Sequence, residues 1–213
     1  MSQHARRVIL DHPSVYPDDL LDGLAAEFSD RRWWVLYTKV HQEKAITRQL
    51  HGRGIPYYLP LVEKTSLWRG RRFLSMVPVF AGYVFLYGNE QERVWSLTTN
   101  RISRILSVSD LEELTRDLRR LQRMIASGAP LTVEKRLARG DRVRVRYGPL
   151  AGLEGVVLRR DGTSRLLIAV DFLQQGASAE IDDHMLEPIS RSWLDGKKET
   201  SVLRSGTLLS RRA

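Results

Sequence analysis

The sequence predicts an α+β protein in which a small antiparallel sheet with flanking helices is followed by a small β-barrel. Between residues 33 and 128, strand-type runs and two helical patterns follow the order β-α-β-β-β-α, which fits a sheet backed by helices. Beyond residue 139, short strand patterns recur at the close spacing typical of a barrel of about 50 residues. The charge also changes, because residues 31–90 hold ten Lys or Arg against three Asp or Glu, whereas residues 131–190 hold nine of each. We therefore expect two modules with different partners.

The composition excludes several classes of protein. With 42% hydrophobic and 28% charged residues, the 213-residue chain is typical of a soluble globular protein. It has no cysteine, so disulfides, iron–sulfur clusters and thiolate zinc sites are excluded. The start has no apolar core of a signal peptide, and no run approaches the ~18 apolar residues of a membrane span, so we expect a cytoplasmic protein. The net charge of +9 favours a polyanionic partner.

The hydrophobic pattern is weak in residues 1–30 and becomes clear from residue 33 onward. Residues 1–30 are acidic, and we expect a poorly ordered extension with at most a short helix near residues 18–28. The aromatic run from Trp33 to Tyr37 is of strand type, and residues 39–51 have the spacing of an amphipathic helix that ends at two glycines. Residues 57–62 predict a second strand.

A basic stretch, KTSLWRGRRF, follows, with its turn expected at Gly70. The run VPVFAGYVFLY, residues 77–87, is predicted as the next strand. Because a strand alternates its faces, one face carries Tyr83, Phe85 and Tyr87. This aromatic face has three interpretations: burial beneath a helix, base stacking as in RNA-recognition folds, or a docking surface for a partner helix.

The remaining elements complete both modules. Residues 95–101 are ambiguous, residues 102–108 predict a short strand, and residues 110–128 form the clearest helical pattern, with Asp110 as its cap. We expect a linker at residues 129–138. The barrel is predicted for residues 139–190, beginning with the alternating run RVRVRY, and a basic disordered tail for residues 191–213.

Catalytic and metal-binding patterns are missing from the sequence. There is no P-loop, no GxSxG and no strand-linked GxGxxG, and the five histidines do not pair at helical spacing. Asp182, Asp183 and His184, with Glu187 nearby, fall where a turn connects strands, so we do not interpret them as metal ligands. The sequence predicts neither an enzyme nor a cofactor.

The basic residues have two interpretations. Lys44 and Arg48 are four residues apart and share a helix face, and Arg69, Arg71 and Arg72 lie at a predicted hairpin tip. Such charges are commonly solvated and do nothing specific. Together with Lys39 they could instead form a surface that attracts phosphates and weakens with salt.

Three stretches, taken in order, resemble the NusG family of transcription elongation factors: WWVLYTKVHQEKAITRQL, VPVFAGYVFLY and GDRVRVRYGPLAGLEGVVL. The first two resemble the NusG N-terminal (NGN) domain, and the third resembles a KOW motif, with Gly155 at the expected glycine. The resemblance covers residues 31–190. It implies an NGN domain at 31–128 and an SH3-like KOW barrel at 139–190. The extensions and the stretch LTTNRISRIL are similar to specialised paralogues of the RfaH, LoaP or UpxY kind. The family usually has proline where this chain has Ala81.

The resemblance implies the site residues. An apolar surface of the family's N-terminal domain packs on the clamp helices of the largest RNA polymerase subunits. By position, the polymerase-binding residues would be Tyr37, Phe80, Tyr83, Phe85, Thr98 and Thr99. The contacts to upstream DNA and the non-template strand would be Lys39, Lys44, Arg48, Arg71, Arg72 and Arg101. Phe172 and Leu173 are the pair we expect to contact a partner of the KOW domain, which could be a ribosomal protein, a termination factor or RNA.

The implied function is non-catalytic modulation of pausing and termination. No feature of the sequence encodes the oligomeric state, so a monomer is the default expectation. A ribosomal or RNA-binding KOW-domain protein is the alternative. Some relatives refold the KOW domain into helices, but the Arg/Val alternation at residues 142–146 favours β structure. We therefore predict no fold switch.

Overall fold

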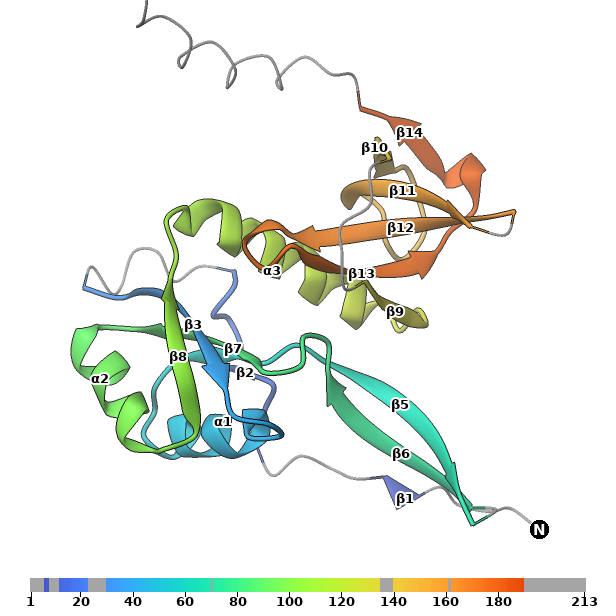
Figure 1. Ribbon diagram of the computed structural model, residues 1–213. Helices are drawn as coiled ribbons and strands as arrows, with labels where there is room; N and C mark the ends of the chain where they lie inside the picture. Colours follow the sequence, from blue (N-terminus) through green and yellow to red (C-terminus); the bar gives the residue numbers. More distant parts are fainter. Residues whose placement is uncertain are drawn as a thin grey trace, which may run out of the picture.

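The computed structural model describes residues 6–7, 12–22, 30–69, 71–134, 140–160 and 162–189. Within this part of the chain, three α-helices and three sheets give the predicted mixed α and β architecture (Figure 1). The tail predicted for residues 191–213 lies outside the described residues, and so does most of the short helix predicted near residues 18–28. The described part of that stretch, residues 18–22, is a turn and not a helix. None of the described helices is both long enough and apolar enough to cross a membrane.

A five-stranded antiparallel sheet forms the centre of the first module, with the strand order β2-β4-β7-β3-β8. Its strands are β2 (Val15–Tyr16), β4 (Tyr57–Tyr58), β7 (Tyr83–Gly88), β3 (Arg32–Thr38) and β8 (Ile102–Ser107). The central strand β3 pairs with β7 on one side and with β8 on the other. The strands predicted at residues 33–37 and 102–108 are therefore confirmed.

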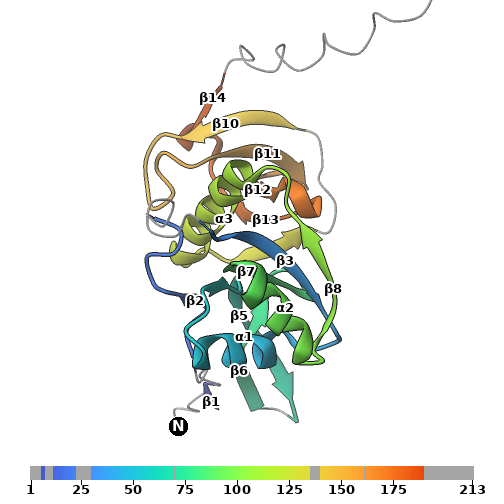
Figure 2. The same ribbon diagram turned by 90° about the vertical axis from the view of Figure 1, so that its left-hand side faces the viewer.

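Helices cover both faces of this sheet (Figures 1 and 2). The face that carries Leu36 and Val84 packs against α1 (Glu43–Gly52) and α2 (Glu90–Thr98). The opposite face, which carries Val35 and Phe85, packs against α3 (Leu111–Ala126). Asp110 caps α3 as predicted, because its side chain accepts a hydrogen bond from the N–H of Glu113 at 2.8 Å. The alternation of side chains along β3 and β7 thus makes two cores rather than one core and one free face.

The apolar run at residues 77–87 is not one strand, contrary to the sequence-based expectation. Strand β6 (Arg71–Pro78) ends inside the run, and β7 begins at Tyr83. Between them the N–H of Tyr83 donates to the carbonyl of Phe80 at 3.2 Å, which closes a turn. Helix α1 also starts four residues later than predicted, because His41 has a left-handed backbone with φ of 57°.

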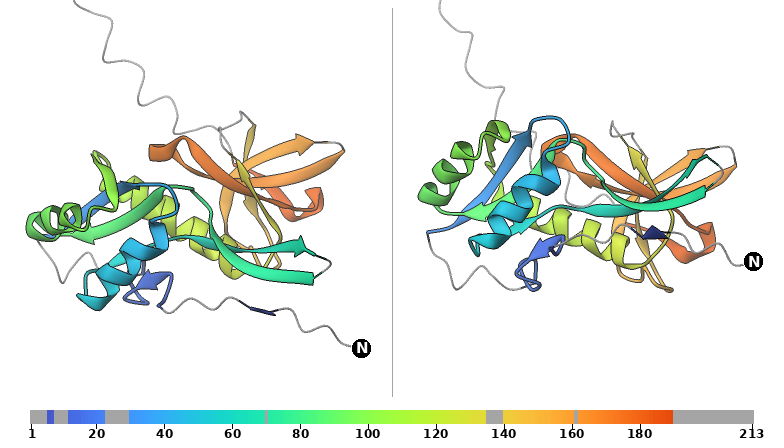
Figure 3. Two further views of the ribbon diagram at one scale, coloured as in Figure 1. Left: turned by 60° about the horizontal axis from the view of Figure 1, so that its bottom comes forward. Right: turned by 90° about the horizontal axis from the view of Figure 1, so that it is seen from below.

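A long hairpin extends away from the five-stranded sheet (Figures 1 and 3). It consists of β5 (Leu61–Trp68) and β6, and β1 (Arg6–Arg7) pairs in parallel with β6. The basic stretch lies at the tip of this hairpin, where β5 ends at Trp68 and β6 begins at Arg71. Gly70, the predicted turn residue, lies outside the described residues. The strand predicted at residues 57–62 is divided between β4 and β5, since Leu59 and Pro60 interrupt it.

The acidic N-terminal segment is ordered over residues 12–22, where the sequence predicted a poorly ordered extension. Strand β2 pairs with β4, and the hydroxyl of Tyr57 donates to the carbonyl of Pro13 at 2.8 Å. Leu20 and Leu21 are 3% and 1% exposed, because they enter the core beside α3. This segment is therefore part of the folded body.

A six-stranded antiparallel sheet forms the second module, with the order β14-β10-β11-β12-β13-β9. Its strands are β9 (Leu131–Glu134), β10 (Asp141–Val145), β11 (Glu154–Arg160), β12 (Thr163–Val170), β13 (Gln175–Glu180) and β14 (Leu186–Pro188), with two short 3-10 helices, η1 (Asp171–Leu173) and η2 (Asp183–Met185). Among the described residues, β9 and β14 are edges that do not pair with each other, so the closed barrel expected from the sequence is not confirmed. Strand β9 lies in the segment predicted as a linker.

Helix α3 joins the two modules, since it lies between the two sheets (Figure 2). One apolar cluster includes Val35 and Phe85 of the five-stranded sheet, Leu118 of α3, and Leu166 and Ile168 of β12. All five side chains are at most 1% exposed. The two modules therefore share one apolar core, in which both sheets pack against α3.

Candidate protein- and nucleic-acid-binding surface

Two tyrosines meet at the end of the central strand pair. Tyr37 of β3 lies opposite Tyr83 of β7, and their ring centroids are 5.2 Å apart. Both side chains are half-buried, so part of each ring faces solvent. The guanidinium of Arg104 on β8 lies 4.9 Å from the centre of the Tyr37 ring, a cation–π distance. The result is an aromatic pair, Tyr37 and Tyr83, beside a positive charge.

A tight turn holds this aromatic pair in place. Gly82 has φ of 85°, and its carbonyl accepts a hydrogen bond from the N–H of Thr38 at 2.7 Å. Its own N–H donates to the carboxylate of Glu43 at 2.7 Å. Glu43 begins α1 and is 6% exposed, so a buried carboxylate ties the turn to the helix. These bonds fix the positions of β3 and β7 at the end that carries both tyrosines.

The other two predicted aromatic contacts are not on the surface. Phe80 and Phe85 are 1% and 0% exposed, and both belong to the cluster beneath α3. Their rings meet edge to face with centroids 6.4 Å apart. Of the three interpretations of the aromatic face, burial beneath a helix is thus the correct one for Phe85. Tyr83 packs against this cluster, whereas Phe80 and Phe85 do not offer a ring to a partner.

A polar corner adjoins the tyrosine pair, where the β3–α1 loop meets the α2–β8 loop. The N–H of Lys39 donates to the carbonyl of Arg101 at 2.8 Å, and the Lys39 ammonium donates to Asn100 Oδ1 at 2.6 Å. The guanidinium of Arg101 donates to Gln42 Oε1. His41 and Asn100 both have left-handed backbones, with φ of 57° and 56°. The two loops therefore place two cations side by side on the surface.

The predicted residues Thr98 and Thr99 end α2 beside this corner. Each hydroxyl donates to a carbonyl three residues earlier, Thr98 to Trp95 and Thr99 to Ser96, at 2.7 Å in both cases. Thr98 is exposed, whereas Thr99 is half-buried. Their hydroxyls thus satisfy the last turn of the helix, and only Thr98 fully faces solvent.

The other predicted basic residues lie at separate places. The Lys44 ammonium donates to the carbonyl of Met76 at 2.5 Å, at the root of the hairpin, and Arg48 is exposed on α1. Arg71 and Arg72 are exposed at the start of β6, at the hairpin tip (Figure 3). The sequence left open whether the basic residues form one surface. The fold divides the six predicted DNA contacts among the polar corner, helix α1 and the hairpin.

Phe172 and Leu173, the pair predicted to contact a partner, lie in η1 against the rest of the molecule. Both are half-buried and pack on the cluster that includes α3 and the six-stranded sheet. The backbone N–H of the neighbouring Asp171 donates to Asp117 of α3 at 3.1 Å. This pair therefore lies at the junction between the modules.

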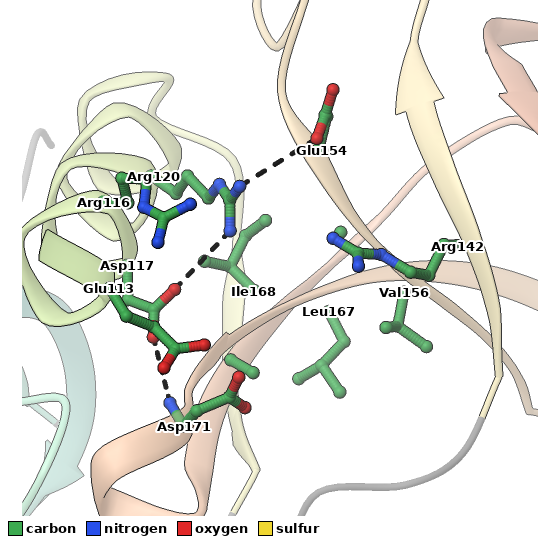
Figure 4. Close-up of a pocket in the computed structure, with 12 residues that line it drawn as sticks. Glu113, Arg116, Asp117, Arg120, Arg142, Glu154, Val156, Leu167, Ile168 and Asp171 are labelled. Carbon is green, nitrogen blue, oxygen red and sulfur yellow. Dashed lines mark hydrogen bonds and ion pairs between the residues drawn. The ribbon is translucent and has the colours of Figure 1, made fainter. Parts of the chain in front are cut away.

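A cavity of about 230 Å³ opens at the same junction (Figure 4). Its wall is charged on the α3 side and apolar toward β12, where Leu167 and Ile168 lie. Burial raises the pKa of the Asp117 carboxyl to about 6, and the hydrogen bond from Asp171 and the charge of Arg120 partly oppose this rise. No group of His, Asp or Glu side chains in the described ranges has the arrangement of a metal site.

Sequence reasoning missed Arg104 and Asn100. Arg104 sits in a strand whose spacing gives it no special role, and only the pairing of β8 with β3 places it over Tyr37. Asn100 follows two threonines in what reads as an ordinary turn. The tolerance of asparagine for a left-handed backbone is the one available signal.

An antiparallel sheet is thus covered by two helices on one face and one on the other, and its half-buried aromatic pair lies beside cationic loops. Residues 31–136 match the family model described as transcription termination factor nusG, which supports membership of the chain in the NusG family. The matched segment is thus similar to a domain of transcription termination factors. A comparison with curated proteins found no match.

Proposed function

We propose that this protein is a bacterial transcription elongation factor of the specialised, RfaH-like kind, which binds RNA polymerase and promotes processive antitermination. The Tyr37–Tyr83 pair would contact the clamp helices of the largest subunits. The observation that carries the proposal is this partly exposed pair, which lies beside cationic loops in the segment that matches the nusG family model. Aromatic anchors on a preorganised surface are the usual centres of protein–protein contacts.

The cations next to the pair suit nucleic acid. Lys39 and Arg101 in the polar corner would contact the non-template strand. Arg48 on α1 and the hairpin-tip residues Arg71 and Arg72 would contact other parts of the DNA. Lys44 already donates to Met76 and would contribute charge alone. Thr98, the exposed end of α2, would contact the opposite side of the polymerase cleft. Such contacts depend on salt, because they release counterions from the DNA.

The mechanism follows from differential binding. A protein that touches both sides of the polymerase cleft binds the closed clamp better than the open one, and so lowers the population of paused states. The six-stranded sheet would be the KOW domain, with Phe172 and Leu173 as its contact to a ribosomal protein, a termination factor or RNA.

The alternative, an RNA-binding protein that stacks bases on its sheet, is less well supported. Stacking needs aromatic rings on an open sheet face, whereas Phe85 is covered by α3. Tyr37 and Tyr83 alone could still stack bases, so the binding of RNA is measured alongside that of polymerase.

The test is binding of the full chain to purified core RNA polymerase, comparing wild type with Tyr37→Ala/Tyr83→Ala. Truncating an anchor at the centre of an interface costs about 2 kcal/mol, so we expect the double variant to bind at least about thirtyfold more weakly. Tyr147→Ala, which truncates a 46% exposed tyrosine on the six-stranded module, is the matched control.

Two outcomes would contradict the proposal. Equal affinity of the double variant and the wild type would remove the tyrosine pair from the interface. Absence of wild-type binding to polymerase, together with tight binding to RNA alone, would favour the RNA-binding class.

A further inference from the structure

Arg104 lies in one row with the two tyrosines of the aromatic pair. Tyr37 of the central strand β3 is directly opposite Tyr83 of β7 on one side and directly opposite Arg104 of β8 on the other. Opposed residues of neighbouring strands share a face of the sheet, so these three side chains form a continuous row across three strands. The strands lie about 5 Å apart, close to the pitch of about 5.4 Å of an α-helix. A helix that lies along the row would therefore place successive turns over successive members.

The row is the uncovered end of a face that α3 covers elsewhere. Val35 and Phe85 lie on the same face, two residues before Tyr37 and two residues after Tyr83, and both are 0% exposed because they pack in the cluster with α3. In the row itself, the two tyrosines are half-buried and Arg104 is exposed. A helix supplied by a partner would thus complete the cover of this face beside α3.

The Arg104 guanidinium has hydrogen-bonding capacity that the chain does not use. It lies 4.9 Å from the centre of the Tyr37 ring, and a guanidinium that stacks on a ring keeps the N–H groups at its edge available. Across the residues that the structure describes, no ion pair joins Arg104 to a carboxylate. The contact with Tyr37 also restricts the side chain before binding, so less conformational entropy is lost when a carboxylate pairs with it.

The charge around the row is positive. The neighbouring Lys39 and Arg101 donate to neutral amide side chains, which do not compensate their charges. The carboxylate of Glu43 is buried and already accepts the N–H of Gly82. An acidic partner is therefore complementary to this end of the sheet.

We propose that Arg104 is a specificity-determining residue, and that the row binds an RNA polymerase helix that carries an Asp or Glu about one turn from an apolar residue. The apolar residue lies on Tyr37 and Tyr83, and the carboxylate accepts hydrogen bonds from Arg104. Polymerase as the partner rests on the proposed function, whereas the acidic character of the helix rests on the row. A nucleic-acid backbone is less complementary, since it repeats a charge at every nucleotide whereas the row offers one cation and two rings.

The test measures binding of the full chain to purified core RNA polymerase over a salt series, with three substitutions at one position. Arg104→Gln removes the charge, Arg104→Glu reverses it, and Arg104→Lys keeps the charge without the planar fork. Arg53→Gln and Arg53→Glu are the matched controls. Arg53 is also exposed and also stacks on a ring, 4.4 Å from the centre of Trp95, but it belongs to the opposite face of the sheet. Urea denaturation of each variant checks that the fold is retained.

At about 50 mM salt, we expect binding to weaken about tenfold for Arg104→Gln and about a hundredfold for Arg104→Glu. Arg104→Lys should bind within about threefold of the wild type. The losses should shrink as the salt concentration rises, because salt screens the attraction that the variants remove. A purely structural effect, such as movement of Tyr37, would not depend on salt. The Arg53 variants should bind as the wild type does.

The outcomes separate this inference from the proposed function. Wild-type affinity for Arg104→Gln and Arg104→Glu, beside loss of binding for Tyr37→Ala/Tyr83→Ala, would overturn the role of Arg104 and leave the proposed function standing. Absence of wild-type binding to polymerase would overturn both. A loss for Arg104→Glu that does not vary with salt would overturn the ion pair. An equal loss of binding to a DNA duplex with an unpaired strand would assign Arg104 to phosphate and overturn the acidic helix.

Discussion

At the scale of single residues, the turn from Phe80 to Tyr83 requires glycine at position 82. The hydrogen bond from the Tyr83 N–H to the Phe80 carbonyl, with φ of 85° at Gly82 and no positive φ at Ala81, identifies a type II turn. A β-carbon at Gly82 would lie 3.3 Å from the ring of Tyr37. Glycine is therefore needed both for the backbone and for the approach of the tyrosine.

Ala81 occupies the turn position that proline favours. It is exposed, and none of the described hydrogen bonds uses its N–H. We expect Ala81→Pro to raise the free energy of unfolding by about 0.5 kcal/mol, because proline restricts the unfolded chain. Urea denaturation measures this, with Gly82→Ala as the contrasting variant, which should lower stability. A loss of stability in Ala81→Pro would show that the turn is not of this type.

Helix caps act at the same scale, between residues that are close in the chain. Asp110 caps α3 as its sequence pattern predicts. Asn89 and Glu92 form a capping box at the start of α2, and their N-x-x-E spacing is a signal that the sequence itself carries. Residues 95–101, ambiguous from periodicity, begin inside the helix that this box starts. A capping box therefore predicts α2 better than apolar spacing does.

At the scale of elements, the hairpin β5–β6 separates two groups of predicted DNA contacts. Arg71 and Arg72 lie at its tip, whereas Lys39 and Arg101 meet in the polar corner of the five-stranded sheet. A two-stranded ribbon with an exposed cationic tip can approach a nucleic-acid backbone apart from the main body. The hairpin and the polar corner should therefore contribute separately to binding.

Replacing both tip arginines tests this separation. We expect Arg71→Gln/Arg72→Gln to reduce the slope of log K against log salt for a DNA duplex with an unpaired strand by up to about 2, with little change in stability. Fluorescence anisotropy over a salt series gives the slope. Arg146→Gln/Arg159→Gln, which removes two exposed arginines from the six-stranded module, should leave it unchanged. A slope unaffected by the tip variant would exclude the hairpin from binding.

At the scale of the whole molecule, the junction at α3 couples stability to pH. The pKa of Asp117 is about 6 in the folded protein and near 4 for an aspartate in an unfolded chain, so the folded state binds more protons between these values. Protonation of Asp117 makes its full contribution to the free energy of unfolding below about pH 4. This contribution is lost as the pH rises through 6.

We therefore expect the free energy of unfolding of the wild type, relative to Asp117→Asn, to fall by roughly 2 kcal/mol between about pH 4.5 and about pH 7.5. The difference between the two proteins isolates Asp117 from the other titrating groups. Guanidinium denaturation at several pH values provides the measurement. A difference that does not vary with pH would mean that Asp117 is not buried at the junction in solution.

The sequence by itself determined the strands at residues 33–37 and 102–108 and the helix capped by Asp110. These depend on periodicity and capping, which act between residues close in the chain. Only the tertiary structure decided that Phe85 lies beneath α3, that Arg104 stands over Tyr37 and that Asp171 meets Asp117 across the junction. Those contacts join residues far apart in sequence, and strand order and helix placement, which no local pattern encodes, decide which residues meet.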